Sequence, residues 1–350
     1  VRGPEMVPSL KAVIARAVVA NRGPSIAEDA LRRLLELAPA EAEALLAKDL
    51  ASGEFRLAAF AAREIPAREI PSADPALSTL LDANQSTALP LIARFASPSL
   101  AARVEKLYDG HSWACAEEEW MVGYLVRVTN GSAVLARAMA NRKGRGCYRT
   151  LLGRVAEIAW TPAVEAQAIA TLSDPDAQTA ANAAQTLAAH GGARVEAPLW
   201  KRLEAWSERW RGRAAELETN PITSALPNPE AQLGSALFQS IASARGWVLD
   251  PARRQRLTGL CIDEDCRKQW AESPAQPLVV EIASGGAFYP PAFRVGSYTA
   301  RTLPALKEKL AQYPPGTAFS WSPQSFNFFS PGQLDAMFRG VSAFLAARAM

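Results

Sequence analysis

The fold class of this chain is clearest in residues 172–191, which read LSDPDAQTAANAAQTLAAHG. Residues 173–176 combine a turn with a helix N-cap, since an Asp or Ser side chain accepts hydrogen bonds from the free N–H groups of a first helical turn. An alanine-rich helix is then expected over residues 177–190. Gly191 and Gly192 end it, because residues without a Cβ suit the left-handed conformation that closes many helices.

Helix, turn and helix alternate on both sides of this segment. Upstream, apolar residues recur at helical spacing over 151–159, and Thr161 and Pro162 stop one helix and start the next. Downstream, a helix after Pro198 places Leu and Trp side chains on one stripe. The pattern extends over about residues 6–270, and alanine fills the expected buried faces, which lets helix axes approach closely as stacked hairpins require.

Beyond residue 272 the period of the apolar residues changes from about 3.6 to 2, which indicates β-strands. The expected elements, in the order ββαβα, are strands at 278–282 and 293–298, a helix around 303–310, a strand at 317–321 and a helix after Pro331. This order is typical of a small sheet with helices on one face. We therefore predict a helical domain over residues 1–272 and a small α/β module over residues 273–350.

The segment 172–191 resembles a HEAT-type repeat, with its apolar helix, Asp-Pro turn, alanine-rich helix and closing Gly. Residues 246–267 and 306–321 look like tail segments of an uncharacterised subgroup of bacterial HEAT-repeat proteins. The resemblance implies a mainly α fold, a right-handed α-solenoid of antiparallel helix pairs closed by the short α/β module. It also implies a curved surface that binds another protein, and the family supplies no catalytic residue.

Composition narrows the possible functions. The chain has 350 residues and a net charge of +3, too small an excess to favour nucleic acid as a partner. His111 and His190 are the only histidines, which argues against reactions that need several imidazoles. No run approaches the roughly 18 apolar residues of a membrane span, and the first residues lack the apolar segment of a signal peptide. Because Val1 is not an initiator Met, we expect that a leader has been removed.

The four cysteines bear on the compartment. Cys261 and Cys266 are five positions apart in an acidic loop, and Cys115 and Cys147 fall on neighbouring expected helices or their ends. Two disulfides, and hence a periplasmic or secreted protein, are the favoured interpretation. Four reduced, buried cysteines in a cytoplasmic protein remain the alternative. A four-cysteine zinc site does not fit the spacing, and no metal or other cofactor is expected.

Aromatic and basic residues alternate over residues 199–213, LWKRLEAWSERWRGR. Such a helix could stack nucleic-acid bases and neutralise phosphates, as HEAT-like DNA glycosylases do. The candidate binding residues are Trp200, Arg202, Trp206, Arg209, Trp210 and Arg213. The favoured alternative places Trp206 and Trp210 in the core and the cations on the solvated face of an amphipathic helix.

Three other segments carry candidate chemistry. The basic loop 142–146 could hold an anion, although an ordinary turn is the simpler interpretation. His111 and Cys115 are four apart and could share a helix face, but the glutamates at 117–119 are explained by the positive end of a helix. In the aromatic segment 321–329, Trp321, Phe326 and Phe328 form either an exposed binding patch or a loop folded onto the sheet.

The sequence thus predicts a non-catalytic protein–protein interaction scaffold, exported to the cell envelope or beyond. The alternative is a HEAT-like enzyme or binder that acts on nucleic acid or a small ligand through the helix at 199–213. Fold-level resemblance alone does not decide between them, because one scaffold hosts many functions.

Overall fold

The computed structural model describes most of the chain. The described residues are 4–19, 24–55, 57, 67–110, 114–129, 131–142, 148–217, 228–271, 278–283, 292–295, 298–300, 303–313, 315, 317–323 and 331–348. The contacts divide the chain into two compact units, residues 2–164 and 165–350. The boundary predicted at 272/273 therefore lies inside the second unit.

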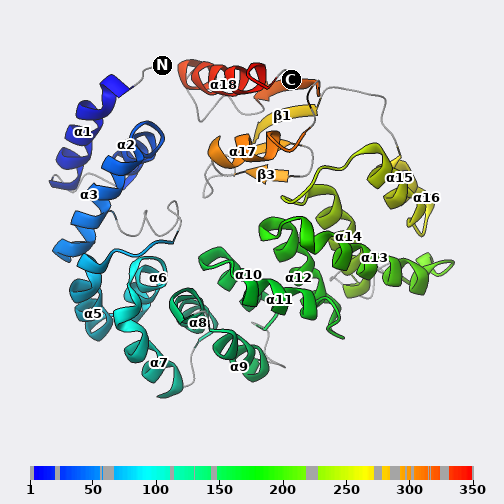
Figure 1. Cartoon of the computed structure of the whole chain (residues 1–350), viewed down its shortest axis with the longest axis horizontal. Coiled ribbons are helices and arrows are strands. Elements are labelled where there is room, and N and C mark those ends of the chain that lie inside the picture. The colour runs from blue at the N-terminus through cyan, green and yellow to red at the C-terminus, as the bar shows by residue number, and fades with distance from the viewer. Residues whose placement is uncertain are drawn as a thin grey trace, which may run out of the picture. The chain divides into compact units, whose positions relative to one another are not determined.

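The first unit is helical, and Figure 1 shows its helices in chain order. Its helices are α1 (Val7–Val19), α2 (Pro24–Leu37), α3 (Pro39–Ser52), α5 (Asp74–Ala83), α6 (Gln85–Phe95), α7 (Ala101–Gly110), α8 (Cys115–Thr129), α9 (Ser132–Arg142) and α10 (Tyr148–Ile158), and α11 (Pro162–Thr171) crosses into the second unit. Local signals set several ends: the Asn84 side chain caps α6 by accepting from the Thr87 N–H, and Gly53 closes α3 at φ +73°.

Helices of the first unit pack on near neighbours in the chain. α1 packs on α2, α2 on α3, α3 on α5 and α5 on α6. Further along, α6, α8 and α10 form a row in which α8 contacts both others, while α7 and α9 also pack on α8. The apolar stripes face these contacts, so that Leu46, Leu77, Ile92 and Val122 are almost fully buried. This packing is mainly local and serial.

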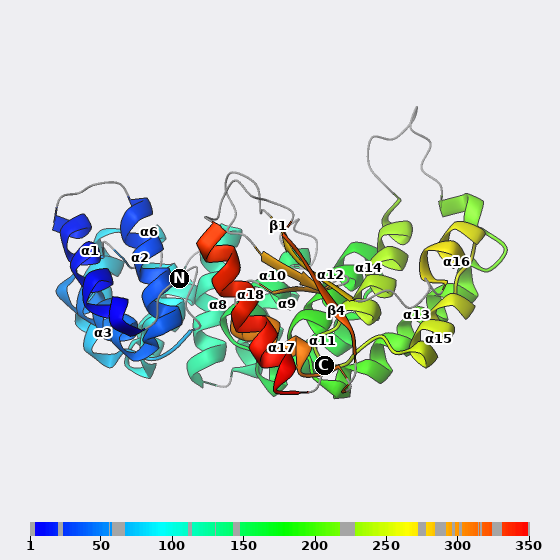
Figure 2. The same cartoon turned by 90° about the horizontal axis from the view of Figure 1, so that it is seen from above.

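The second unit begins with further helices. They are α12 (Ala177–His190), α13 (Glu196–Trp210), α14 (Pro229–Ser243), α15 (Pro251–Gly259) and α16 (Glu264–Trp270). α12 has the predicted bounds, and Asp176 caps it by accepting from the Gln178 N–H. α12 and α13 both pack on α14, and α15 and α16 lie side by side as a short hairpin (Figure 1, Figure 2).

The conformation of Gly191 differs from the left-handed one expected. This residue ends α12 in an extended conformation, with φ −74° and ψ 153°, and not in the left-handed conformation. A Cβ at this position would lie 2.6 Å from the Leu187 carbonyl oxygen and 2.6 Å from a Val195 methyl carbon. Glycine is therefore required here by the close approach of neighbouring atoms rather than by the backbone angles.

The chain then forms a four-stranded sheet with two helices. The elements are β1 (Leu278–Ala283), β2 (Ala292–Val295), β3 (Tyr298–Ala300), α17 (Leu303–Leu310), β4 (Phe319–Pro323) and α18 (Pro331–Ala346). The strand order is β3-β2-β1-β4, with β1 and β4 parallel and the other pairs antiparallel. The single strand expected at 293–298 is two strands, because Val295 pairs with Tyr298 and the chain reverses between them.

One face of this sheet is covered by both helices. Val280, Phe293 and Val295 of the strands share a buried cluster with Leu306 of α17 and Val341 of α18. Period-2 alternation places these strand residues on one face. Helices α17 and α18 bury that face and complete a two-layer arrangement.

The sheet is joined to the helices of the second unit through α17. The buried Lys309 ammonium donates to the carbonyl oxygens of Ala244 and Trp247, the latter at 2.7 Å. Beside it, Arg245 Nη2 lies 2.5 Å from Glu308 Oε1. These contacts connect the segment after α14 to α17 within the second unit.

No helix within the described ranges has both the length and the apolar character needed to cross a membrane.

Candidate functional site

The tryptophans of α13 are buried. Trp200, Trp206 and Trp210 are 2%, 4% and 7% exposed. Each indole N–H also has an acceptor within the chain: Trp200 donates to Glu196 Oε1 at 3.2 Å, and the other two donate to Glu230, at 3.0 Å and 3.1 Å. These rings offer no open face on which bases could stack, so the structure supports the core interpretation for them and not the nucleic-acid one.

The arginines of the same helix contact the chain itself. Arg202 Nε donates to the Leu172 carbonyl oxygen just after α11, at 2.7 Å, and burial lowers the pKa of its guanidinium. Arg209 Nη1 lies 3.2 Å from Glu230 Oε1, and Arg213 Nη2 lies 2.5 Å from Glu216 Oε2. Both guanidinium groups also lie about 5 Å from the centre of the Trp210 ring. The basic side chains thus have partners within the chain itself.

The predicted aromatic patch is only partly described. Trp321 of β4 is half-buried, with its ring centre 6.4 Å from that of Phe293 and 6.0 Å from that of Phe338. It therefore belongs to the packing between sheet and α18. Phe326 and Phe328 lie outside the described residues.

The cysteines are oxidised where they are described. Cys261 and Cys266 form a disulfide with a Cα–Cα distance of 5.5 Å. Cys115 is disulfide-bonded too, and its expected partner Cys147 lies outside the described residues. A disulfide sulfur cannot serve as a thiolate nucleophile, so the candidate pair of His111 and Cys115 is excluded as a thiolate–imidazole site.

The glutamates after Cys115 lie at the start of a helix, as expected. Glu118 and Glu119 of α8 are also buried. The Tyr108 hydroxyl donates to Glu118 Oε1 at 3.2 Å, and the Thr150 hydroxyl donates to Glu119 Oε1 at 3.1 Å. Two other candidates, His111 and the basic loop at 143–146, lie outside the described residues.

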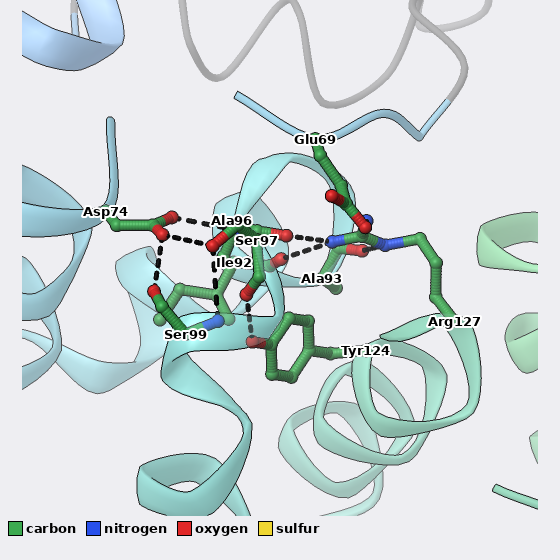
Figure 3. A network of polar contacts seen from close by, with 9 residues as sticks. All are labelled: Glu69, Asp74, Ile92, Ala93, Ala96, Ser97, Ser99, Tyr124 and Arg127. Atoms are coloured by element: carbon green, nitrogen blue, oxygen red, sulfur yellow. Dashed lines mark hydrogen bonds and ion pairs between the residues drawn. The ribbon is translucent and has the colours of Figure 1, made fainter. Parts of the chain in front are cut away.

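A buried polar network holds α5, α6 and α8 of the first unit together (Figure 3). The Asp74 carboxylate accepts from the Ser97 N–H at 3.0 Å and from the hydroxyls of Ser97 and Ser99. The Tyr124 hydroxyl donates to the Ser97 carbonyl oxygen, and burial raises the pKa of this tyrosine above its usual value. The donors and acceptors satisfy one another and no imidazole takes part, so the network stabilises a junction rather than forming a reactive centre.

Arg127 extends this network to the end of α6 (Figure 3). Its guanidinium donates to three carbonyl oxygens, those of Ala93 at 3.0 Å, Ile92 at 3.4 Å and Ala96. Burial lowers the pKa of Arg127, while the negative charge of Glu69 raises it. A cation at a helix C-terminus complements the helix dipole and caps carbonyls that lack helical partners.

The second unit contains a cavity of about 410 Å³, which we call the 206–270 pocket. It is lined by Trp206, Ala214, Leu217, Ala231, Gly234, Ser235, Phe238, Gln239, Ile262, Asp263, Asp265, Cys266, Gln269 and Trp270. These residues come from α13, the turn after it, α14 and the segment that includes α16. Ligand pockets commonly have volumes of about 300–1,000 Å³, so this pocket can take a small ligand or one or two side chains.

Three aromatic rings form a row in the pocket. Trp206 meets Phe238 edge to face at 6.3 Å, and Phe238 stacks on Trp270 at 6.0 Å. Gly234 makes this packing possible, because a Cβ there would lie 2.2 Å from Trp206 Cζ2. The row is thus closely packed and apolar.

The disulfide lies at another side of the pocket, where Cys266 is a lining residue. It links the end of α15 to α16, where Asp263 caps the helix by accepting from the Cys266 N–H at 2.7 Å. The Thr258 hydroxyl donates to the Trp270 carbonyl oxygen at 3.0 Å, which fixes the far end of α16. The sequence singled out the cysteines but not Phe238 or Trp270, whose only signal was an apolar side chain within the helical pattern of about residues 6–270.

Within the described residues, no group of three or more His, Cys, Asp or Glu side chains could hold a metal ion. No protein-family model matches this chain, and comparison with curated proteins and with solved structures finds no similar protein.

Proposed function

We propose that this protein is a non-catalytic scaffold that binds another protein through the 206–270 pocket. The observation that carries the proposal is the pocket itself: a row of aromatic rings held by packing, with polar side chains such as Gln239 and Gln269 around it. Aromatic anchoring points surrounded by polar groups are typical of sites that take up side chains of a partner.

The fold proposal is a HEAT-like right-handed solenoid whose end is closed by the C-terminal α/β module. Support comes from the serial packing within each unit, where α6, α8 and α10 form one row and α12 packs on α14. A second support is a repeated device: Arg127 of α8 donates to carbonyls at the end of α6, and Arg202 of α13 donates to the carbonyl just after α11. Repeated units with repeated junction contacts are expected in solenoids.

The location proposal is the periplasm or the exterior of the cell. Its support is the disulfide between Cys261 and Cys266, together with the oxidised state of Cys115. Structural disulfides persist in oxidising compartments and are rare in the cytosol. A nucleic-acid enzyme is not proposed, because the tryptophans that suggested it are buried.

Site-specific photocrosslinking tests the binding proposal. A benzophenone side chain is placed at Gln239, which is exposed and lines the pocket, and in a control at the exposed Glu105 of α7. After irradiation in the intact source cell, we expect one discrete protein adduct from position 239 and none of that mass from position 105. The proposal fails if position 239 gives no adduct, or if both positions give the same set of adducts.

A further inference from the structure

Among the described residues, the charged side chains that line the 206–270 pocket are of one sign. Asp263 and Asp265 line it, and none of the described lysines or arginines does. Asp263 uses one oxygen to cap α16, and a carboxylate with two oxygens keeps further acceptor capacity. Asp265 Oδ1 lies 3.8 Å from Nζ of the exposed Lys268. An exposed ion pair of this kind is weak, so a ligand cation could replace Lys268 at little cost in free energy.

The charge of this lining is the feature that favours a cation. The rings of Trp206, Phe238 and Trp270 are 4%, 5% and 9% exposed, so they form the apolar wall of the pocket and do not present open π faces. Carboxylates attract a planar or tetrahedral cation more strongly than a neutral or acidic group.

We propose that the 206–270 pocket binds an arginine or lysine side chain from an exposed basic segment of the partner protein. This inference rests on the proposed binding function and names the chemistry of the partner. The pocket volume of about 410 Å³ suits such a side chain with part of its backbone, but not a folded element. Gln239 and Gln269 supply amide groups that can bond the backbone of the segment.

Peptide titrations test the inference with defined probes. The probes are Ac-Gly-Arg-Gly-amide, its lysine analogue and its citrulline analogue, which has nearly the shape of arginine without the charge. We follow the assigned indole N–H resonances of Trp206 and Trp270 in the full chain. Saturable shifts are expected with the arginine and lysine peptides, and affinity at least fivefold weaker with citrulline. Equal binding of citrulline, or no saturable shift with any peptide, would overturn the inference.

Charge removal provides the matched variant. Asp263→Asn with Asp265→Asn removes two charges while an Asn at 263 can still cap α16. We expect this variant to bind the arginine peptide at least fivefold more weakly. Glu105→Gln with Asp109→Asn makes the same change of net charge on α7 of the first unit and should alter affinity less than twofold. Equal losses in both variants, or none in the first, would contradict the inference.

A second variant keeps the test decisive if the charge variant fails to fold. Ser235 is exposed on α14 and lines the pocket, so Ser235→Trp fills the pocket without changing any charge. It should abolish the peptide-induced shifts at Trp270, and retained shifts would refute the inference. If photocrosslinking at position 239 succeeds while the peptides fail, the binding function stands and only the cationic partner is wrong.

Discussion

At the scale of single residues, buried polar groups join segments that are distant in the sequence. Asp74 is 8% exposed, and its carboxylate accepts hydrogen bonds from Ser97 and Ser99 in the segment between α6 and α7. Removing a buried acceptor leaves its donors without partners, which costs more free energy than the hydrogen bonds contribute on balance.

Asp74→Ala should therefore lower the free energy of unfolding by about 2–4 kcal/mol, measured by urea denaturation followed by circular dichroism. The control is Asp82→Ala on the same helix, where the carboxylate is exposed and pairs with Arg103. That change should cost less than about 1 kcal/mol. Similar losses at both positions would contradict a special contribution of Asp74 to stability.

Gly234 makes a second residue-scale prediction. Gly234→Ala would place a Cβ 2.2 Å from Trp206 Cζ2, so the indole must shift. We expect a loss of about 1–3 kcal/mol in the free energy of unfolding and a changed Trp206 indole resonance. Gly259→Ala is the control, because a Cβ there meets nothing within 4 Å. It should change stability by less than about 1 kcal/mol, and a larger loss there than at 234 would refute this account.

At the scale of elements, charged side chains join helix ends to their neighbours. Arg127 and Arg202 donate hydrogen bonds to carbonyl groups at the ends of α6 and α11. Lys309 of α17 donates to the carbonyl of Ala244, which follows α14. In each case, burial lowers the pKa of the cation, and for Lys309 it lowers the pKa to about 8. The helix carbonyls partly offset the cost of removing these charges from water.

Lys309 makes stability depend on pH. Its folded pKa of about 8 lies below the pKa of roughly 10.4 in an unfolded chain. Between these values the unfolded state holds more protons, so the free energy of unfolding contributed by Lys309 rises with pH. From about pH 7.5 to 10, wild type should gain about 1–3 kcal/mol relative to Lys309→Met, measured by urea denaturation.

The matched control for this pH dependence is Lys307→Met on the same helix. Lys307 is half-buried, and its ammonium lies 5.8 Å from the centre of the Phe344 ring. Its replacement should leave the rise in stability with pH unchanged. A difference between wild type and Lys309→Met that stays constant over the range would show that Lys309 keeps its charge in the folded protein.

At the scale of the whole molecule, the redox state of the cysteines connects the structure to its compartment. Within the described residues no cysteine is free. A disulfide that closes a loop restricts the unfolded chain, and structural disulfides are common in oxidising surroundings and rare in the cytosol.

Thiol trapping in the source cell tests whether Cys261 and Cys266 are joined there. The cells are alkylated before lysis, and peptides are mapped without reduction. We expect Cys261 and Cys266 in one linked peptide without alkylation. The same sample, reduced and then alkylated with a second reagent, should carry that reagent at both positions. Alkylation of both cysteines by the first reagent would contradict an extracytoplasmic location.

Local features of this fold followed from the sequence. The bounds of α12, its Asp176 cap and the pairing of Cys261 with Cys266 agree with the expectations, because each depends on residues within about one or two turns of one another. The strand starting at 278 and the helix at 303–310 were also correctly expected from the change of apolar period.

The candidate site could not be predicted from the sequence in the same way. Trp206, Phe238 and Trp270 meet in one pocket although 64 residues separate the first from the last in the sequence. Asp74, at the start of α5, accepts a hydrogen bond from the N–H of Ser97, which follows α6. Such contacts depend on how helices pack, and helical periodicity shows only which face is apolar, not which partner covers it.

The amino-acid sequence alone determined a mainly helical chain that ends in a small mixed segment, because periodicity, caps and proline positions act over a few residues. Tertiary structure decided between the two interpretations of the α13 tryptophans, in favour of the core. It alone showed that a pocket forms beside the disulfide and that the last segment is held to the helices through Lys309. The physical reason is that burial and charge pairing depend on which distant residues meet in space.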